Sequence, residues 1–372
     1  MARFAMARRS ARLASVFVVV AAVIGPVSVV PDADLSGSGG TATASPESRR
    51  LAGGRVVLSY RGLSPTEAVL TMIRRGHAAG VIIFRDNVGS RDQLIRSLRR
   101  LRKAAAEAPG ARPLLLMTDQ EGGPVRRLPG GPETSARRTE SGADQGTAAA
   151  ATLGDVGLNV NLAPVLDVFD HPGNFIDRFE RSFAQDPLRV AELGRAFVVA
   201  QQARGVAATA KHFPGLGSAE REDNTDERPV TLAVPLERLR EHGEEPYRAA
   251  IAAGVRLVML SWAVYPALDP DRPAGLSRAV VGAELRDRLG FRGVTVTDAL
   301  EARALARVGD TGARAVAAAG AGMDLLLCSA QDPRQAEQAG AALAAAMEAG
   351  QLDRRSFDES LARINELRTS LS

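Results

Sequence analysis

The stretch Gly293-Val-Thr-Val-Thr-Asp298 is a short apolar, β-branched run that ends in a carboxylate. A glycine opens it, and a helix-like sequence rich in alanine and leucine follows it. Such a run is typical of a strand buried in a parallel sheet. The pattern therefore predicts that Asp298 lies at the carboxyl end of a buried strand and faces the space above the sheet.

Runs of the same kind recur along the chain, and helix-like segments separate them. The predicted strands are 56–60, 80–84, 114–119, 160–167, 207–212, 255–261, 293–298 and 323–328. The predicted helices are 65–75, 91–107, 141–156, 187–204, 235–253, 278–289, 299–319 and 333–349, with a last one at 356–367. Eight β/α units predict an α/β protein with a single (β/α)8 TIM barrel. A doubly wound open sheet is the alternative, but no Gly-x-Gly-x-x-Gly follows the first strand.

The first 53 residues differ in composition from the rest. Four arginines and no acidic residue lie within residues 1–12, and residues 13–30 are almost wholly apolar. This arrangement predicts that residues 1–30 are a signal peptide or an uncleaved membrane anchor, and that the protein is extracellular or at the cell surface. We expect residues 31–53 to be a flexible linker and residues 54–372 to be the barrel domain.

The composition and charge of the chain exclude some classes of binding partner. The chain has 47 basic and 43 acidic residues, and outside residues 1–12 the two charges balance. Without a basic stripe we expect no nucleic-acid partner. The single cysteine, Cys328, lies in an apolar run and is expected to be a buried hydrophobe. No two of the four histidines have metal-ligand spacing, so we expect no metal or cofactor. We also expect a monomer that contacts a membrane only through an N-terminal anchor.

Polar residues end several of the predicted strands, and in a barrel of this kind the carboxyl ends of the strands form the active site. These residues are Asp119, Asp167, Lys211, Ser261 and Asp298. No phosphate-binding loop or nucleophilic serine motif accompanies them. Carboxylates beside groups that bind hydroxyls are the residues that glycoside hydrolysis requires.

Two loops carry candidate ligand-binding groups. Asp119 could accept hydrogen bonds from vicinal hydroxyls and Arg127 could donate one, while the alternative is a structural Asp–Arg pair. Lys211 stands at a strand end, where a buried ammonium needs a polar partner or a ligand. A structural salt bridge would satisfy it equally. His212 could act as a base or as a hydrogen-bonding group.

Six motifs occur in order along the chain. They are Asp-Gln-Glu-Gly-Gly-x-Val-x-Arg at 119–127, Leu-Ala-Pro-Val-Leu-Asp-Val at 162–168, Arg-Ser-Phe at 181–183, Lys-His-Phe-Pro-Gly at 211–215, Tyr-Pro-Ala-Leu-Asp at 265–269 and Leu-Gly-Phe-x-Gly-Val-x-x-x-Asp at 289–298. Together they resemble glycoside hydrolase family 3, in its bacterial β-N-acetylhexosaminidase branch. The resemblance runs from residue 55 to the end and leaves no room for the C-terminal sandwich domain of many members.

The resemblance implies a retaining, two-step hydrolysis of terminal N-acetylglucosamine from cell-wall fragments or other amino-sugar oligomers. Asp298 matches the nucleophile, and Asp167 matches a structural or binding carboxylate beneath the site. The residues that match those holding the terminal sugar are Asp119, Arg127, Arg181, Lys211 and His212.

One loop departs from the family pattern. In this branch the loop after Lys-His-Phe-Pro-Gly carries a histidine that serves as the general acid/base, but here no histidine follows until His242. One alignment places Thr225 at that position, and threonine cannot do this chemistry. An alignment with one more inserted residue places Asp226 there, and a carboxylic acid with a raised pKa can protonate a leaving group. We therefore expect the acid/base on loop 216–229, at Asp226, with Asp223 and Glu222 as alternates, and expect the loop to act as a lid.

Two other functions remain open on the sequence. A non-catalytic amino-sugar-binding protein would explain the missing histidine. A β-glucosidase-type exo-glycosidase is also open, because the pocket for the acetamido group is not visible in a sequence. Transfer to phosphate or to another acceptor is a further alternative.

Overall fold

The structure is a computed structural model that describes residues 44–371. The predicted signal peptide or anchor, and the linker up to residue 43, lie outside the described residues. Within 44–371, none of the helices combines the length and the apolar character needed to span a bilayer.

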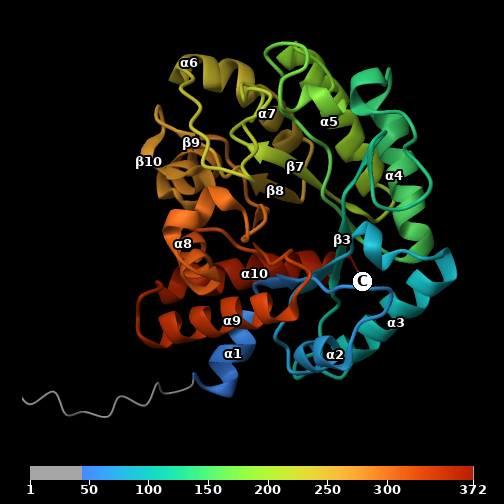
Figure 1. The fold of residues 1–372 in the computed structure, drawn as a ribbon, viewed down its shortest axis with the longest axis vertical. Coiled ribbons are helices and arrows are strands. Elements are labelled where there is room, and N and C mark those ends of the chain that lie inside the picture. Colours follow the sequence, from blue (N-terminus) through green and yellow to red (C-terminus); the bar gives the residue numbers. More distant parts are fainter. Residues whose placement is uncertain (1–43, 372) are drawn as a thin grey trace, which may run out of the picture. The chain divides into compact units, whose positions relative to one another are not determined.

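Eight parallel strands form the centre of the fold (Figure 1). They are β1 (Val56–Leu58), β2 (Gly80–Ile82), β3 (Leu115–Thr118), β6 (Val160–Asn161), β7 (Ala207–Phe213), β8 (Leu257–Leu260), β11 (Val294–Thr297) and β12 (Leu326–Leu327). Each strand pairs with the next one along the chain, β12 pairs with β1, and a parallel bridge between Val296 and Leu325 links the last two strands. The sheet therefore closes on itself, which confirms the predicted (β/α)8 barrel.

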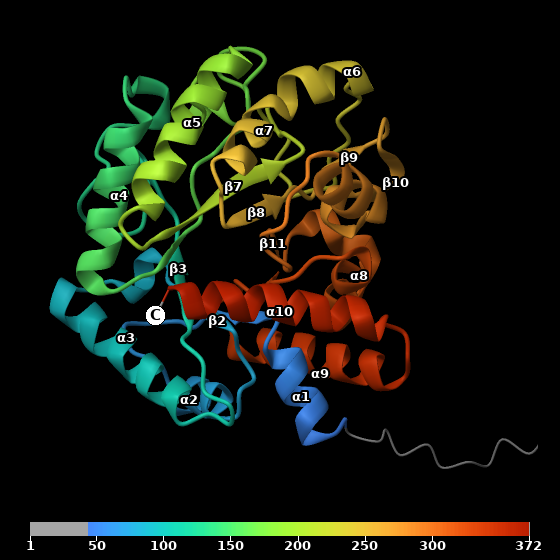
Figure 2. The same ribbon diagram turned by 180° about the vertical axis from the view of Figure 1, so that it is seen from behind.

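Helices cover the outside of the barrel (Figures 1 and 2). They are α2 (Glu67–Arg74), α3 (Arg91–Ala106), α4 (Gly142–Val156), α5 (Pro187–Gln202), α6 (Leu236–Arg238), the π-helix η4 (Leu239–Gly243), α7 (Glu245–Ala252), the π-helix η6 (Ala279–Arg288), α8 (Thr311–Ala321) and α9 (Pro333–Glu348). Short 3-10 helices occur at η1 (Arg85–Asn87), η2 (Ala136–Arg138), η3 (Asp177–Phe179), η5 (Ala274–Leu276) and η7 (Arg303–Val308). Two hairpins complete the fold, β4 (Gln120–Gly122) with β5 (Val125–Arg126), and β9 (Val264–Tyr265) with β10 (Asp269–Pro273).

The interior of the barrel is apolar, and a helix closes its amino end. Val57, Leu115 and Val294 belong to one buried cluster inside the strands. Helix α10 (Arg354–Ser370) adds Ile364 and Leu367 to that cluster, and in Figure 2 it passes in front of the strands. The side chains of the strands and of α10 thus fill the interior of the barrel from its amino end.

The prediction of a flexible linker over residues 31–53 is wrong for the last eight of these residues. Residues Pro46–Gly53 form helix α1, which Ser45 caps by accepting a hydrogen bond from the Ser48 amide. The Ser45 amide also donates to Glu348 Oε1 of α9 at 2.8 Å. A proline at the first turn and a serine at the N-cap favour a helix here, and packing on the barrel holds it in place.

The predicted helix 299–319 is wrong in its first half, because regular helix α8 begins at Thr311. Gly309 has a φ of 110°, which ends the preceding 3-10 helix, and Asp310 caps α8 through the Ala313 amide. Residues 299–310 therefore form an irregular segment next to Asp298, which contains the short 3-10 helix η7 in place of the predicted α-helix. The predicted strand 160–167 is also interrupted, because Pro164 has no N–H to donate, and Val165 rejoins the sheet through a bridge to Lys211.

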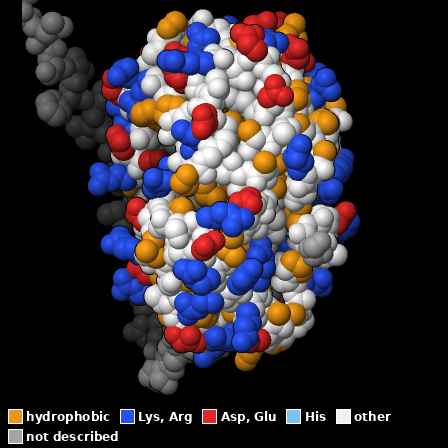
Figure 3. Space-filling view, turned by 90° about the vertical axis from the view of Figure 1, so that its right-hand side faces the viewer, with side chains coloured by type: hydrophobic (Ala, Val, Ile, Leu, Met, Phe, Trp, Pro, Cys, Tyr) orange, Lys and Arg blue, Asp and Glu red, His pale blue; other side chains and the backbone are white. Residues whose placement is uncertain are grey.

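Acidic and basic side chains are interspersed over much of the face shown in Figure 3. Basic side chains gather in its lower half. Helix α3 carries exposed Arg96, Arg99, Arg100 and Lys103. The near-neutral overall balance of the described part thus includes a local excess of positive charge on α3.

Candidate active site

A cavity of about 760 Å³ lies at the carboxyl ends of the strands. It is lined by the residues predicted to be catalytic or sugar-binding, namely Asp119, Arg127, Arg181, Lys211, His212, Asp226 and Asp298. The strand-end residues Asp167 and Ser261 and the alternate acids Asp223 and Glu222 are not part of its lining. The predicted residues that line it come from four separate β/α units, those of β3, β6, β7 and β11, and the closed barrel brings them to one opening.

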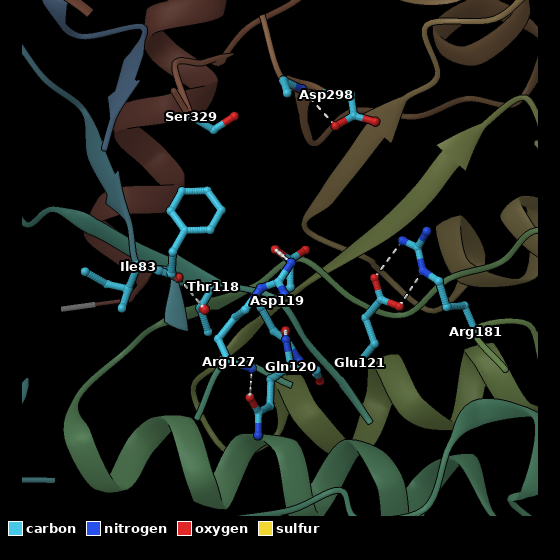
Figure 4. A network of polar contacts seen from close by, with 12 residues as sticks. Ile83, Thr118, Asp119, Gln120, Glu121, Arg127, Arg181, Asp298 and Ser329 are labelled. Atoms are coloured by element: carbon cyan, nitrogen blue, oxygen red, sulfur yellow. Dashed lines mark hydrogen bonds and ion pairs between the residues drawn. The ribbon is translucent and has the colours of Figure 1, made fainter. Parts of the chain in front are cut away.

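An ionic network forms one wall of this cavity. Lys211 Nζ lies 2.8 Å from Asp119 Oδ1 and 2.8 Å from Glu121 Oε1. The Arg181 guanidinium donates to both oxygens of Glu121, at 2.9 and 2.8 Å (Figure 4). Lys211 is only 2% exposed, so its buried charge is balanced by two carboxylates. The predicted salt bridge and the predicted ligand-facing position of Lys211 are therefore both present.

The network keeps both of its carboxylates ionised. Burial alone would raise the pKa of Glu121, but the charges of Arg181 and Lys211 outweigh it and hold that pKa far below its ordinary value. Burial also raises the pKa of Asp119, but the charges of Lys211 and Arg127 lower it by more, so the pKa of Asp119 lies below its ordinary value. Ionised Asp119 is an acceptor for ligand hydroxyls at the cavity surface.

Arg127 is positioned by the hairpin of β4 and β5. The Gln120 side-chain oxygen accepts from the Arg127 amide at 3.1 Å, and Arg127 Nη2 lies 3.5 Å from Asp119 Oδ2. Gly122 and Gly123, with φ of 118° and 53°, form the turn. A Cβ on Gly123 would lie 2.6 Å from the Ser135 Cβ, so this turn requires glycine.

His212 is fixed by a buried carboxylate. Its Nδ1 lies 2.7 Å from Asp167 Oδ2, and Asp167 Oδ1 accepts from the amides of His212 and Leu216 at 3.2 and 2.7 Å. Asp167 is fully buried, which gives it the structural position that the resemblance implied. The bond at Nδ1 leaves Nε2 of the imidazole for a ligand.

Asp298 follows β11 directly. Its Oδ1 accepts from the Ala299 amide at 2.8 Å (Figure 4), and the Ala299 carbonyl accepts from Trp262 Nε1 at 2.9 Å. In the part of the chain that the structure describes, the Asp298 carboxylate makes no ion pair and no other hydrogen bond. One oxygen is therefore held in place while the other is available to a reacting carbon.

The loop that carries Asp226 is docked on the segment that follows Asp298. The Arg303 amide donates to the Asp226 carbonyl at 3.1 Å, and the Ala304 amide donates to the Thr225 carbonyl at 3.0 Å. The Asp226 amide donates to Asn224 Oδ1 at 3.0 Å. In this structure the loop expected to be a lid therefore has a defined position, with Asp226 lining the same cavity as Asp298.

The surroundings of Asp226 favour its protonated form. Its partial burial and the charges of Asp298 and Glu301 raise the pKa of Asp226 to about 6. The charges of His212 and Arg181 oppose this shift. A carboxylic acid with this pKa carries its proton in mildly acidic solution and can also release it, as a general acid/base requires.

Three carboxylates that line the cavity were not predicted as site residues, namely Glu121, Glu227 and Glu301. Glu121 was visible within the quoted motif 119–127, but nothing local showed that it pairs with Arg181 and Lys211. Glu301 lies three residues after Asp298, in a segment predicted as helix, and accepts from Ser329 Oγ at 2.6 Å and from Gln335 Nε2 at 2.9 Å.

Comparison with proteins of related sequence shows the family to which this chain belongs. The glycosyl hydrolase family 3 N-terminal domain matches residues 51–367. A protein of Arthroderma benhamiae, described as an uncharacterized secreted glycosyl hydrolase, is 44% identical over 328 residues, which are 86% of this chain and 93% of the relative.

Solved structures give the same result. A family 3 β-N-acetylglucosaminidase from Paenibacillus sp. str. FPU-7 superimposes with a TM-score of 0.81 at 35% identity, over 87% of this chain and 62% of that one. A β-N-acetylhexosaminidase from Beutenbergia cavernae superimposes with a TM-score of 0.77 at 33% identity, over 88% of this chain and 100% of that one. The chain is a glycoside hydrolase and belongs to glycoside hydrolase family 3.

Proposed function

We propose that this glycoside hydrolase is a retaining exo-β-N-acetylhexosaminidase that releases terminal N-acetylglucosamine from cell-wall fragments or other amino-sugar oligomers. The observation that carries the proposal is the placement of Asp298 and Asp226 in one cavity. Among residues 44–371, one oxygen of Asp298 has no hydrogen-bond or ion-pair partner, and the pKa of Asp226 is raised to about 6. The names of the solved relatives support the choice of sugar.

The two carboxyl groups divide the reaction between them. In the first step an oxygen of Asp298 attacks the anomeric carbon while the proton of Asp226 passes to the glycosidic oxygen, so that the bond to the leaving group breaks and a glycosyl ester forms. In the second step ionised Asp226 takes a proton from water, the water oxygen attacks the anomeric carbon, and Asp298 is released. Asp119, Arg127, Arg181, Lys211 and His212 hold the sugar hydroxyls.

The closed lower end of the cavity supports exo action. Ile82, Leu162 and Met259 line the cavity and also belong to the buried cluster inside the barrel. No channel for a second sugar is expected beyond the ionic network, because apolar side chains fill the barrel below it. The terminal residue therefore enters first, and the rest of the substrate remains toward solvent.

The test compares leaving groups. Asp298→Asn should abolish turnover of the 4-nitrophenyl β-glycoside of N-acetylglucosamine and of chitobiose. Asp226→Asn should spare the first-turnover release of 4-nitrophenolate, which needs no acid, while slowing the later hydrolysis of the glycosyl ester, and should lower kcat/KM for chitobiose about 10²- to 10⁴-fold. Asp223→Asn, which removes the neighbouring loop carboxylate paired with Arg228, is the matched control and should cleave both substrates. Full activity of Asp298→Asn would disprove the proposal.

Because the chain belongs to a family of hydrolases, we favour an enzyme over the alternative of a non-catalytic sugar-binding protein. The β-glucosidase alternative is tested by the 4-nitrophenyl β-glucoside. We expect kcat/KM for the N-acetylglucosamine glycoside to exceed that for the glucoside, and the reverse order would favour a β-glucosidase.

We also propose that the protein is exported. The basic and then apolar pattern of residues 1–30 and the description of the Arthroderma benhamiae relative as secreted support this. Cell fractionation of the full chain and of a chain lacking residues 1–30 tests the proposal. Retention of the full chain in the cytoplasm would contradict it.

A further inference from the structure

Four arginine and lysine side chains line the cavity in the described part of the chain, and one of them lacks a carboxylate partner. Arg127, Arg181 and Lys211 each lie within ion-pair distance of Asp119 or Glu121. The Arg178 guanidinium makes no hydrogen bond and no ion pair among residues 44–371, and its Nε is buried without an acceptor. The guanidinium lines the cavity with no carboxylate of the described residues beside it, so this position suits an anionic ligand.

Two aromatic rings hold the Arg178 guanidinium in place. Its central carbon lies 5.1 Å from the centroid of Phe175 and 4.6 Å from that of Phe179. Contacts of this kind orient a guanidinium without neutralising its charge. Phe175 is 8% exposed and Phe179 is 44% exposed. The two rings and the cation therefore extend from the buried part of the cavity wall to its rim.

This group lies beside the loop that carries Asp226. Asn174 Nδ2 donates to the Gly217 carbonyl at 2.7 Å, and the Phe175 amide donates to the Ala219 carbonyl at 3.2 Å. Phe175, Phe179 and Asp226 line one cavity. Because Asp226 is the proposed acid for the leaving oxygen, the rim beside its loop faces the leaving group rather than the terminal sugar.

We propose that Arg178 and Phe179 form an aglycone subsite that selects a leaving sugar carrying a carboxylate. This inference rests on the proposed function, because it requires a glycoside in the cavity. The guanidinium fork matches the two oxygens of a carboxylate, and the exposed face of Phe179 can stack on the C–H face of a sugar ring. Two classes of sugar supply such a group, a muramic acid with its lactyl carboxylate and a uronic acid with its C6 carboxylate.

The test uses pairs of substrates that differ only in charge. N-Acetylglucosamine β-1,4-linked to N-acetylmuramic acid, and to glucuronic acid, are each compared with their methyl esters, with chitobiose as the neutral reference. For the wild type we expect kcat/KM to be about 10- to 100-fold higher for at least one acid than for its ester, the range of a charged hydrogen bond. The acid with the larger ratio identifies the source of the carboxylate.

Arg178→Met keeps an unbranched side chain between the two rings and removes the charge. It should bring the acid-to-ester ratio to about 1 and leave chitobiose hydrolysis within roughly twofold of the wild type. Arg178→Lys, which keeps the charge without the fork, should give an intermediate ratio and serves if the methionine variant does not fold. Arg137→Met is the matched control. Its guanidinium lies 4.7 Å from the Phe169 ring and pairs with Asp177, so the ratio should not change.

The outcomes separate the two proposals. An acid-to-ester ratio near 1 in the wild type, or a high ratio that survives Arg178→Met, overturns the subsite. Absence of turnover of every glycoside by the wild type overturns the proposed function instead. In that case calorimetric binding of each acid and its ester to the wild type and to Arg178→Met still tests the subsite, which requires tighter binding of the acid that the methionine variant loses.

Discussion

Replacing Glu301 by glutamine should lower the pKa of Asp226 and move the pH dependence of catalysis. The carboxylate of Glu301 is held by Ser329 Oγ at 2.6 Å and by Gln335 Nε2 at 2.9 Å. It lines the cavity together with Asp226. Because its charge disfavours a second negative charge nearby, it keeps the proton on Asp226. Glutamine has nearly the same shape, retains one acceptor oxygen and removes the charge.

The size of the change follows from the causes of the shift. The pKa of Asp226 rises from 3.8 to about 6, through burial first, then Asp298, then Glu301. Glu301 is the smallest of these three contributions, so its removal should lower the pKa by roughly 0.5 to 1 unit. The groups left facing Asp226 are then Asp298, His212 and Arg181.

The assay is the pH profile of kcat/KM, which reports the free enzyme. Asp226 must be protonated to act as the acid, so kcat/KM for chitobiose should fall as the pH rises through about 6 in the wild type. In Glu301→Gln this fall should occur at a pH lower by the same roughly 0.5 to 1 unit. With the 4-nitrophenyl glycoside, whose leaving group needs no acid, the fall should be absent in both proteins.

Glu227→Gln is the control, because Glu227 lines the same cavity and adjoins Asp226 but is not among the main causes of its raised pKa. Its profile should move less than that of Glu301→Gln. An unchanged or higher midpoint in Glu301→Gln would refute the reasoning. Loss of chitobiose cleavage at every pH, with the aryl glycoside spared, would show that Glu301 itself is the acid.

Three further predictions concern stability and positioning. Glu121→Gln should lower the free energy of unfolding in urea at neutral pH by about 3–5 kcal/mol, because it breaks a buried ionic network. Since the pKa of Glu121 is lowered in the folded protein, the wild type should lose this extra stability as the pH falls below 4.5. Equal stability of the two proteins at neutral pH would contradict this prediction. Ile364→Ala should cost about 2–5 kcal/mol of stability beneath the barrel with unchanged KM, and a changed KM would contradict the assigned position. Trp262→Phe should lower kcat about 2- to 12-fold through loss of the hydrogen bond beside Asp298, and kinetics equal to the wild type would show that this bond does not position the nucleophile.

Regular elements were predicted well because their signals are local. An apolar, β-branched run such as 293–298 is typical of a strand buried on both faces, and eight such runs separated by helices favour a barrel. The predictions of secondary structure were wrong where packing or turn geometry decided the local conformation. Residues 46–53 form a helix that packs on α9. Residues 299–310 are an irregular segment with one 3-10 helix, and this segment contacts the loop of Asp226.

The candidate site was predictable only where a residue's place on its own strand was enough. Asp119, Lys211 and Asp298 could be placed at the barrel mouth because each ends an apolar run. Their partners could not be found in this way, because pairing depends on chains that meet only in the folded barrel. Glu121 and Arg181 are 60 positions apart, and no local pattern joins them.

The sequence by itself determined the strands, the order of the barrel and the residues at its open end, since each depends on the alternation of apolar runs, turns and helices along the chain. Only the tertiary structure decided which charges are paired, that Asp226 lies near Glu301 and Asp298, and that Arg178 has no carboxylate partner among residues 44–371. Electrostatic interactions depend on distance in space and on burial. Neither quantity exists until the barrel closes and its loops pack against one another.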